Sequence, residues 1–180
     1  MEKILFNSKN IFIAKENSRI EEVAKRNKIV LPSNHTTLFQ AVLSPIDKPN
    51  NNGHELTKEA VEESLPSFIG SQVNINHSSD KANRWMVGQI LDAWVNKDNE
   101  IETIFSFARN IYSEEYTMAL EAMAEGKLTV SWELSSESAK IEKLNNGVLR
   151  LHAIEWGGMA VLIGKKPGYK AARVTEMASL

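Results

Sequence analysis

The chain has no cysteine, and none of its four histidines shows the spacing of metal ligands. The absence of cysteine excludes disulfide bonds, thiolate metal sites and a cysteine nucleophile. Zinc sites built from histidine usually place two of them a few residues apart, and this pattern is missing. We therefore expect neither a metal nor any other cofactor.

Long apolar runs and an excess of one charge are also missing. The longest apolar run, residues 159–163, is too short to span a bilayer, and residues 1–6 lack the apolar core of a signal peptide. The 21 basic and 23 acidic residues give a net charge of −2, with no basic stretch suited to a nucleic-acid backbone. We expect a soluble, intracellular protein that binds neither membranes nor nucleic acids.

At 180 residues the chain can bury a full core without covalent staples. We expect a single domain over residues 1–165 and a peripheral C-terminal tail over residues 166–180. Capping signals and periodicity predict helices at 18–27, 58–65 (ending before a proline) and 114–125. Alternation predicts strands at 3–6, 11–14, 29–31, 38–43, 73–77, 85–95, 100–108, 126–134, 140–144, 148–156 and 159–163. This order favours an α+β fold, a mostly antiparallel β-barrel surrounded by a few helices.

The strand at residues 126–134 has two chemically distinct faces. Its apolar face carries Leu128, Val130, Trp132 and Leu134, and its polar face carries Lys127, Thr129, Ser131 and Glu133. The hydroxyl of Ser131 would therefore be held rigidly and still be exposed, as an attacking group requires. A serine on the polar face of a strand is otherwise ordinary, so the interpretation of Ser131 as a nucleophile depends on its partners.

A serine hydroxyl needs a base that accepts its proton. Alternation places His77 at the end of the strand 73–77, on the same face as Val73 and Ile75. This position makes His77 the favoured base, although a half-buried structural histidine would show the same pattern. The remaining histidines are predicted to lie in loops or on a solvent-facing strand, namely His35, His54 and His152.

A third group should fix the tautomer of the base. Glu155 is favoured, because a regular strand 148–156 would place it beside apolar side chains, and a buried carboxylate needs a partner. Glu133, on the face of Ser131, competes for the role, and His152 is a weaker alternative; Glu155 could also simply bond backbone or nearby lysines. Backbone amides at 157–158 or 164–166 are candidates for an oxyanion hole.

Three ordered stretches resemble motifs of the tailed-phage prohead maturation proteases. Residues 56–77 resemble the segment that leads to their catalytic histidine, and residues 87–93 (VGQILDA) resemble their VGxIxDA strand. Residues 126–131 (GKLTVS) resemble the segment in which a helix ends at glycine and the chain enters the nucleophile strand. Ser131 follows His77 by 54 residues, which also fits that group. The resemblance covers roughly residues 37–165.

These proteases are related to herpesvirus assemblins, and the resemblance implies the same helix-surrounded β-barrel. It implies a serine endopeptidase in the host cytoplasm that cleaves scaffold and major capsid proteins inside the assembling prohead, with His77 as base and Ser131 as nucleophile. Residues 159–166 resemble the assemblin segment that follows a second catalytic histidine, but residues 157–158 are glycines here. Many phage members use an acidic residue on this strand, which favours Glu155. Assemblin-like enzymes often dimerise, so a homo-oligomer is also expected.

The resemblance also bears on the C-terminal residues. Phage proteases of one large group cut after a glutamate that follows an aliphatic residue by two positions, and Val174-Thr-Glu176 before Met177 fits this pattern. Residues 166–180 are therefore a candidate self-cleavage region; the alternative is a chance glutamate in a terminal segment.

A second function remains open on the sequence. The chain could be a non-catalytic structural barrel of the same lineage, a tail-tube or capsid-associated component, in which Ser131 and His77 would lie far apart. An unrelated small-molecule hydrolase has no support, because no GxSxG motif surrounds Ser131.

Overall fold

The computed structural model describes residues 18–31, 33–77, 86–135 and 140–178. The three helices of this part are α1 (Arg19–Arg26), α2 (Lys58–Phe68) and α3 (Ser113–Ala124). Its strands are β1 (Thr36–Pro45), β2 (His54–Leu56), β3 (Gln72–Ile75), β4 (Gly88–Val95), β5 (Glu100–Ala108), β6 (Leu128–Leu134), β7 (Lys140–Lys143), β8 (Leu149–Ala153), β9 (Trp156–Ile163) and β10 (Arg173–Ala178).

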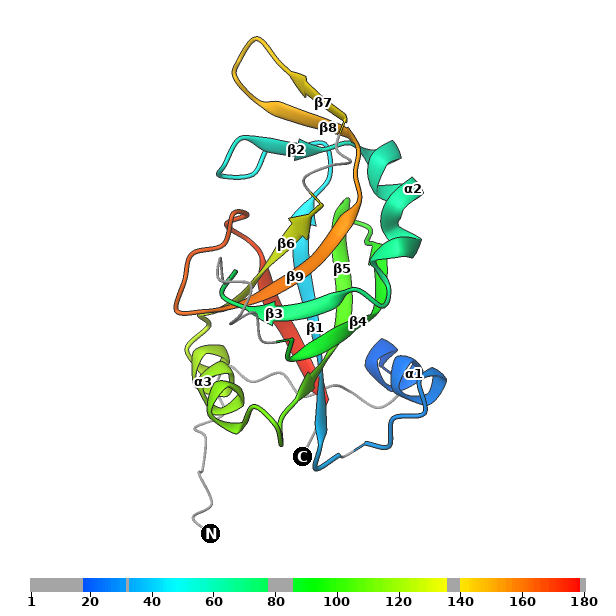
Figure 1. The fold of residues 1–180 in the computed structure, drawn as a ribbon, viewed down its shortest axis with the longest axis vertical. Coiled ribbons are helices and arrows are strands. Elements are labelled where there is room, and N and C mark those ends of the chain that lie inside the picture. The colour runs from blue at the N-terminus through cyan, green and yellow to red at the C-terminus, as the bar shows by residue number, and fades with distance from the viewer. Residues whose placement is uncertain (1–17, 32, 78–85, 136–139, 179–180) are drawn as a thin grey trace.

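Seven strands form one curled sheet in the order β10-β1-β5-β4-β3-β9-β6 (Figure 1). Neighbouring strands are antiparallel except β3 and β9, which are parallel. The curl brings the edge strand β6 back into contact with β1 and β10. The expected α+β class with mostly antiparallel strands is confirmed, and the sheet is a half-barrel in the described residues.

Aromatic side chains fill the inside of the curl. Phe39 on β1 stacks on Phe105 of β5 at 5.4 Å between ring centroids, and Phe107 meets Phe39 edge-on at 6.2 Å. Phe68 at the end of α2 packs on Trp156 of β9 at 4.5 Å. Each such buried side chain contributes about 1.5–3 kcal/mol of hydrophobic stabilisation, so this core fixes the strands that carry polar groups on their other face.

Several predicted elements differ from the structure in their bounds. Residues 29–31 form no strand, and the predicted strands 3–6 and 11–14 lie outside the described residues. Pro66 was expected to follow α2, but it lies within the last turn of the helix. The packing of Phe68 on the core holds that turn in helical form despite the proline. The single strand predicted at 148–156 is two strands, β8 and β9, separated at residues 154–155.

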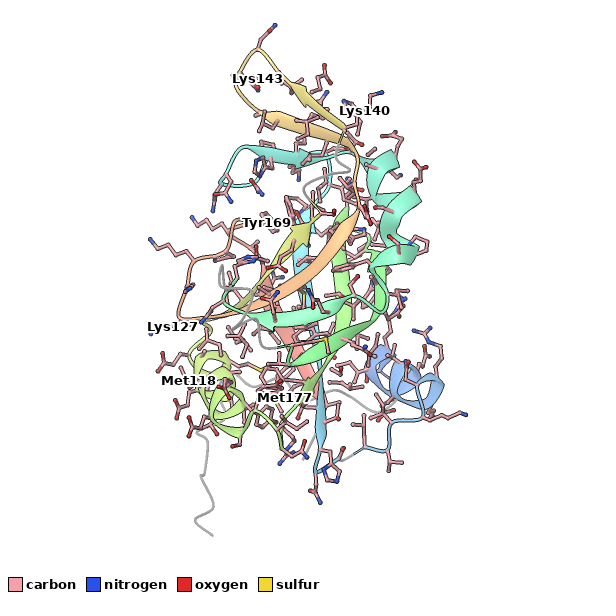
Figure 2. The ribbon with its side chains drawn as sticks, in the orientation of Figure 1. Met118, Lys127, Lys140, Lys143, Tyr169 and Met177 are labelled. Atoms are coloured by element: carbon pink, nitrogen blue, oxygen red, sulfur yellow. The ribbon has the colours of Figure 1, made fainter. Side chains whose placement is uncertain are left out.

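The segment expected to be a peripheral tail contains a strand of the main sheet. β10 pairs with β1 in antiparallel register, with Met177 opposite Phe39, and Met177 is only 1% exposed (Figure 2). The expectation of a peripheral location is therefore wrong for residues 173–178. The physical reason is that β1 offers an unpaired edge, and Met177 supplies an apolar side chain to the core beside it.

A second sheet, in the order β2-β8-β7, projects from the half-barrel as an arm (Figure 1). Lys140 and Lys143 lie on this arm (Figure 2), and every residue of β7 is exposed. Arg150 of β8 binds Glu55 of β2 at 2.6 Å between Nε and Oε1. Among the described residues, no helix combines the length and the apolar character that crossing a bilayer would demand.

Candidate active site

Strand β9 lies between β6 and β3 and sets the spacing of the candidate site. Ser131 and Glu133 project from the same face of β6, where they pair with Ala160 and Gly158 of β9. On the other side of β9, Asn74 of β3 pairs with the same Ala160. Because Ala160 and Gly158 carry almost no side chain on this face, Glu133 and Asn74 can meet across β9.

The turn after β3 brings His77 to this face. Asn76 and His77 both have left-handed backbones, with φ of 58° and 48°. Asn and His adopt this conformation more readily than most residues. The backbone N–H of Asn76 donates to the Val161 carbonyl, and the side-chain Oδ1 of Asn76 accepts from the Ile163 N–H, each at 2.9 Å. These bonds fix the turn against β9.

The turn overturns the expected orientation of His77. Alternation placed His77 on the face of Val73 and Ile75, which pack on the core. The regular strand instead ends at Ile75, and the two left-handed residues rotate the His77 ring to the opposite face. It lies there with Asn74 and Glu133.

The carboxylate of Glu133 is held at both oxygens. His77 Nδ1 lies 2.8 Å from Oε1, and Asn74 Nδ2 donates to Oε2 at 2.7 Å. The Glu133 side chain is 13% exposed and that of His77 38%. Because a carboxylate only accepts hydrogen bonds, the contact places the proton of a neutral His77 ring on Nδ1. The other nitrogen, Nε2, then carries the lone pair that a general base needs.

Ser131 and His77 line one cavity of about 240 Å³. Within the part of the chain that the structure describes, no hydrogen bond joins the Ser131 hydroxyl to the His77 ring. Catalytic hydrogen bonds are often long in enzymes without substrate and tighten in the complex. The geometry therefore brings the predicted nucleophile and base to one cavity, with the Glu133 carboxylate on the Nδ1 side of the ring.

Two loops complete the cavity wall opposite β6. Asn50 and Asn52 come from the loop after β1 and His54 from the start of β2, while Gly168 and Tyr169 come from the segment before β10. The loops are joined by the bond from the Asn51 N–H to the Gly168 carbonyl, at 2.6 Å.

Tyr169 is anchored at its hydroxyl and lies beside β6 (Figure 2). Its O–H donates to Glu100 Oε1 at 2.8 Å. Burial raises the pKa of Tyr169 above its ordinary value, and the hydrogen bond to the Glu100 carboxylate raises it further. The phenol is therefore a neutral, fixed part of the wall at physiological pH.

Glu155 does not lie where the sequence predicted. Its side chain is exposed, whereas a continuous strand would have partly buried it. The break between β8 and β9 falls at residues 154–155, so the alternation that runs from Leu149 does not reach Glu155. The structure places Glu133, and not Glu155, against the His77 ring.

The weaker alternative, His152, lies on the arm. Its Nε2 is 2.7 Å from Glu142 Oε2, and neither residue lines the cavity beside Ser131. Of the acidic and histidine candidates, only Glu133 combines a direct contact with His77 and a position on the face of Ser131.

The two candidate segments for an oxyanion hole differ in their surroundings. Gly158 is paired with Glu133 inside the β6–β9 ladder. The segment 164–166 leaves β9 beside the His77 turn, where Lys165 Nζ donates to the Asn76 carbonyl at 3.2 Å. The backbone carbonyl of Lys165 accepts a hydrogen bond from Thr129 Oγ1 at 3.4 Å, and Thr129 lies on the same face of β6 as Ser131. This proximity favours the amides of 164–166.

Sequence reasoning missed Asn74 and Asn76. The one available signal was Asn76, since an asparagine just before a histidine at a strand end is typical of a left-handed turn. The described residues contain no cluster of three potential metal ligands.

No family model, no curated protein and no solved structure matches the chain.

Proposed function

We propose that the protein is a serine endopeptidase in which Ser131, His77 and Glu133 form the catalytic relay. The observation that carries this proposal is the 2.8 Å contact between His77 Nδ1 and Glu133 Oε1. The His77 residue that makes this contact lines the same cavity as Ser131. That contact selects the tautomer with a free Nε2, which is the state a serine hydroxyl requires of its base.

The relay would act by ordinary acyl transfer. Ser131 Oγ attacks the peptide carbonyl carbon while His77 Nε2 takes its proton, and the Glu133 carboxylate stabilises the resulting imidazolium. The amides of residues 164–166 would bind the negative oxygen of the tetrahedral intermediate. His77 then returns the proton to the leaving amine, and a water molecule, activated in the same way, hydrolyses the acyl-enzyme.

The surroundings of Ser131 suit a peptide substrate. Among the described residues β6 is an edge strand of the sheet, so one side of it has no strand hydrogen-bonded to it. An extended peptide can add to such an edge through main-chain hydrogen bonds. The cavity between β6 and the loops at 50–54 and 168–169 is then placed to take a side chain next to the scissile bond.

For the biological role we propose maturation of a tailed-phage prohead. The ordered motifs at residues 56–77, 87–93 and 126–131 support this role, as does the cavity that His77 and Ser131 share in a β-rich half-barrel. The assemblin-like fold, the scaffold and major capsid proteins as substrates, and a location inside the assembling prohead belong to the same proposal.

Self-cleavage after Glu176 is part of the proposal and has a structural condition. The bond between Glu176 and Met177 lies inside β10, which is paired with β1. A protease binds an extended, accessible peptide, so β10 would have to separate from β1 before cleavage. We expect intact mass spectrometry to show a shortened C-terminus in the wild type that Ser131→Ala lacks, and identical C-termini would contradict this part.

The decisive test of the function compares three forms of the protein. Wild type, Ser131→Ala and the control Ser106→Ala are each incubated with denatured casein and co-expressed with the scaffold and major capsid proteins of the same genome. Ser106 is a suitable control because it is also a strand serine, but on β5 and outside the cavity. We expect cleavage by the wild type and Ser106→Ala, and none by Ser131→Ala.

Two outcomes would overturn the proposal. Equal cleavage by wild type and Ser131→Ala would remove Ser131 as the nucleophile. Absence of cleavage by the folded wild type in both assays would favour a non-catalytic structural component instead.

A further inference from the structure

We infer that Asn74 is a positioning residue of the proposed active site, and that it sets the tautomer and orientation of His77 through Glu133. This inference rests on the proposed function. Asn74 touches neither the cavity nor Ser131, and its effect would pass through the carboxylate alone.

Asn74 and His77 together hold both oxygens of the Glu133 carboxylate. A carboxylate that binds a histidine through one oxygen can still rotate about its terminal bond, and this rotation would swing the second oxygen toward the ring. Asn74 Nδ2 holds Oε2 at 2.7 Å, while Oε1 remains on His77 Nδ1 at 2.8 Å. With both oxygens held, the carboxylate has one orientation, and the ring that it binds has one as well.

Asn74 is itself held rigidly inside the sheet. Its side chain is 1% exposed on a strand that pairs with β4 on one side and β9 on the other. Functional groups are held most accurately by neighbours whose own rotamers are fixed by packing. Asn74 meets this requirement better than the ring of His77, which is 38% exposed and needs external support.

Strand β9 carries two small residues, Gly158 and Ala160, between the strands of Glu133 and Asn74. A side chain at position 160 larger than alanine, on the face between Ser131 and Asn74, would stand between the two outer strands. Gly158 opposite Glu133 is tighter still, since an added Cβ would lie 2.6 Å from the Gln72 carbonyl oxygen. A larger side chain at position 160 would therefore narrow the path between Asn74 and Glu133, and one at position 158 would displace Gln72 at the start of β3.

A purely structural role for Asn74 is the competing explanation. Its Oδ1 is buried and has no hydrogen-bond partner among the described residues. A buried amide with an unpaired acceptor stabilises a fold less well than a packed apolar residue would. The two explanations differ in one respect: only the positioning role predicts that His77 changes when Asn74 is replaced.

The test uses the full-length protein and two readouts. The first is ¹⁵N NMR of histidine-labelled protein, with the His77 signals assigned by comparison with His77→Ala. The second is the rate at which a fluorophosphonate modifies Ser131, together with kcat and KM for peptides derived from casein. The variants are Asn74→Leu, which keeps similar bulk without a donor, and Asn74→Asp.

We expect wild-type His77 to be protonated at Nδ1 and Asn74→Leu to show a mixture of tautomers. The rate of Ser131 modification and kcat should fall about 10- to 100-fold in Asn74→Leu, the scale of a misplaced catalytic group, with KM little changed. In Asn74→Asp the activity relative to wild type should recover as the pH falls, because a protonated carboxyl again donates to Glu133. The activity of Asn74→Leu relative to wild type should not recover as the pH falls, because leucine has no donor at any pH.

A matched control separates this effect from loss of stability. Thr37→Val removes another buried hydrogen bond, from Thr37 Oγ1 to the Tyr116 hydroxyl at 2.8 Å, away from the cavity. It should lower stability without changing the His77 signals or the rates.

The outcomes also separate this inference from the proposed function. If the wild type reacts with the fluorophosphonate but folded Asn74→Leu matches it in rate and in His77 tautomer, the inference about Asn74 is wrong. If the folded wild type does not react, the proposed function fails, and the inference about Asn74 fails with it.

Discussion

Replacement of Glu133 by glutamine should disable the site without changing its shape. With the Asn74 amide oriented as in the structure, Nδ2 can only donate, so the new side chain turns its carbonyl oxygen toward Asn74. Its NH₂ group then faces His77 Nδ1, which has to accept the hydrogen bond. The ring is forced to carry its proton on Nε2, the nitrogen that should receive the proton of Ser131.

The expected magnitude follows from known relays and from the exposure of this ring. The equivalent carboxylate-to-amide change lowers kcat about 10⁴-fold in serine proteases. His77 is 38% exposed, so water can compete for Nδ1 and restore part of the productive tautomer. We therefore expect a loss of about 10³-fold, or about 4 kcal/mol of transition-state stabilisation.

The assay is the rate of Ser131 modification by a fluorophosphonate, with kcat on denatured casein as a second measure. Glu142→Gln is the matched control, because it alters another His–Glu contact, with His152 on the arm, at the same 2.7–2.8 Å separation. That variant should keep wild-type rates. A folded Glu133→Gln protein within threefold of wild type would refute the role of Glu133 and the tautomer argument with it.

Three further predictions concern stability and the catalytic role predicted for Glu155. Gly158→Ala, at φ 141° and with its Cβ 2.6 Å from the Gln72 carbonyl oxygen, should lose about 2–3 kcal/mol in urea unfolding. Tyr169→Phe should lose about 1–2 kcal/mol at neutral pH, where the bond to Glu100 is intact. Because the pKa of Tyr169 is raised above 10.0, this difference should shrink as the pH rises past 10.0. Glu155→Gln, at an exposed position, should keep proteolysis within twofold of wild type.

Each of these has its own control or contrary result. Gly157→Ala should cost less than Gly158→Ala, since its added Cβ would lie 3.3 Å from the nearest atom and its φ is not left-handed. A Tyr169→Phe difference that stays constant up to pH 11 would exclude the bond to Glu100 as its source. A loss of proteolysis in Glu155→Gln as large as that in Glu133→Gln would restore Glu155 as the acid.

The parts of the site that the sequence could predict are those governed by local alternation. β6 has one face against the core and one face open, so period-two alternation alone placed Ser131 and Glu133 on the same side. The helix α3 follows from its apolar periodicity, and the left-handed Gly126 just beyond its end, with φ of 68°, follows from local capping rules.

The parts that the sequence could not predict depend on contacts between distant segments. Asn74 meets Glu133 only because β3 pairs in parallel with β9, more than 80 residues later in the chain. His77 was placed on the wrong face because two left-handed residues interrupt the alternation. The predicted burial of Glu155 is wrong for the same kind of reason, since the strand that precedes it is interrupted one residue before it.

The most direct test of the central claim is to map the residue that a fluorophosphonate modifies. Wild-type protein is treated with the reagent, digested with trypsin and examined by tandem mass spectrometry, beside His77→Ala. We predict a single phosphonylated residue, Ser131, in the wild type and none in His77→Ala. Modification spread over several serines, or equal modification of Ser131 in both proteins, would contradict an activated relay of Ser131, His77 and Glu133.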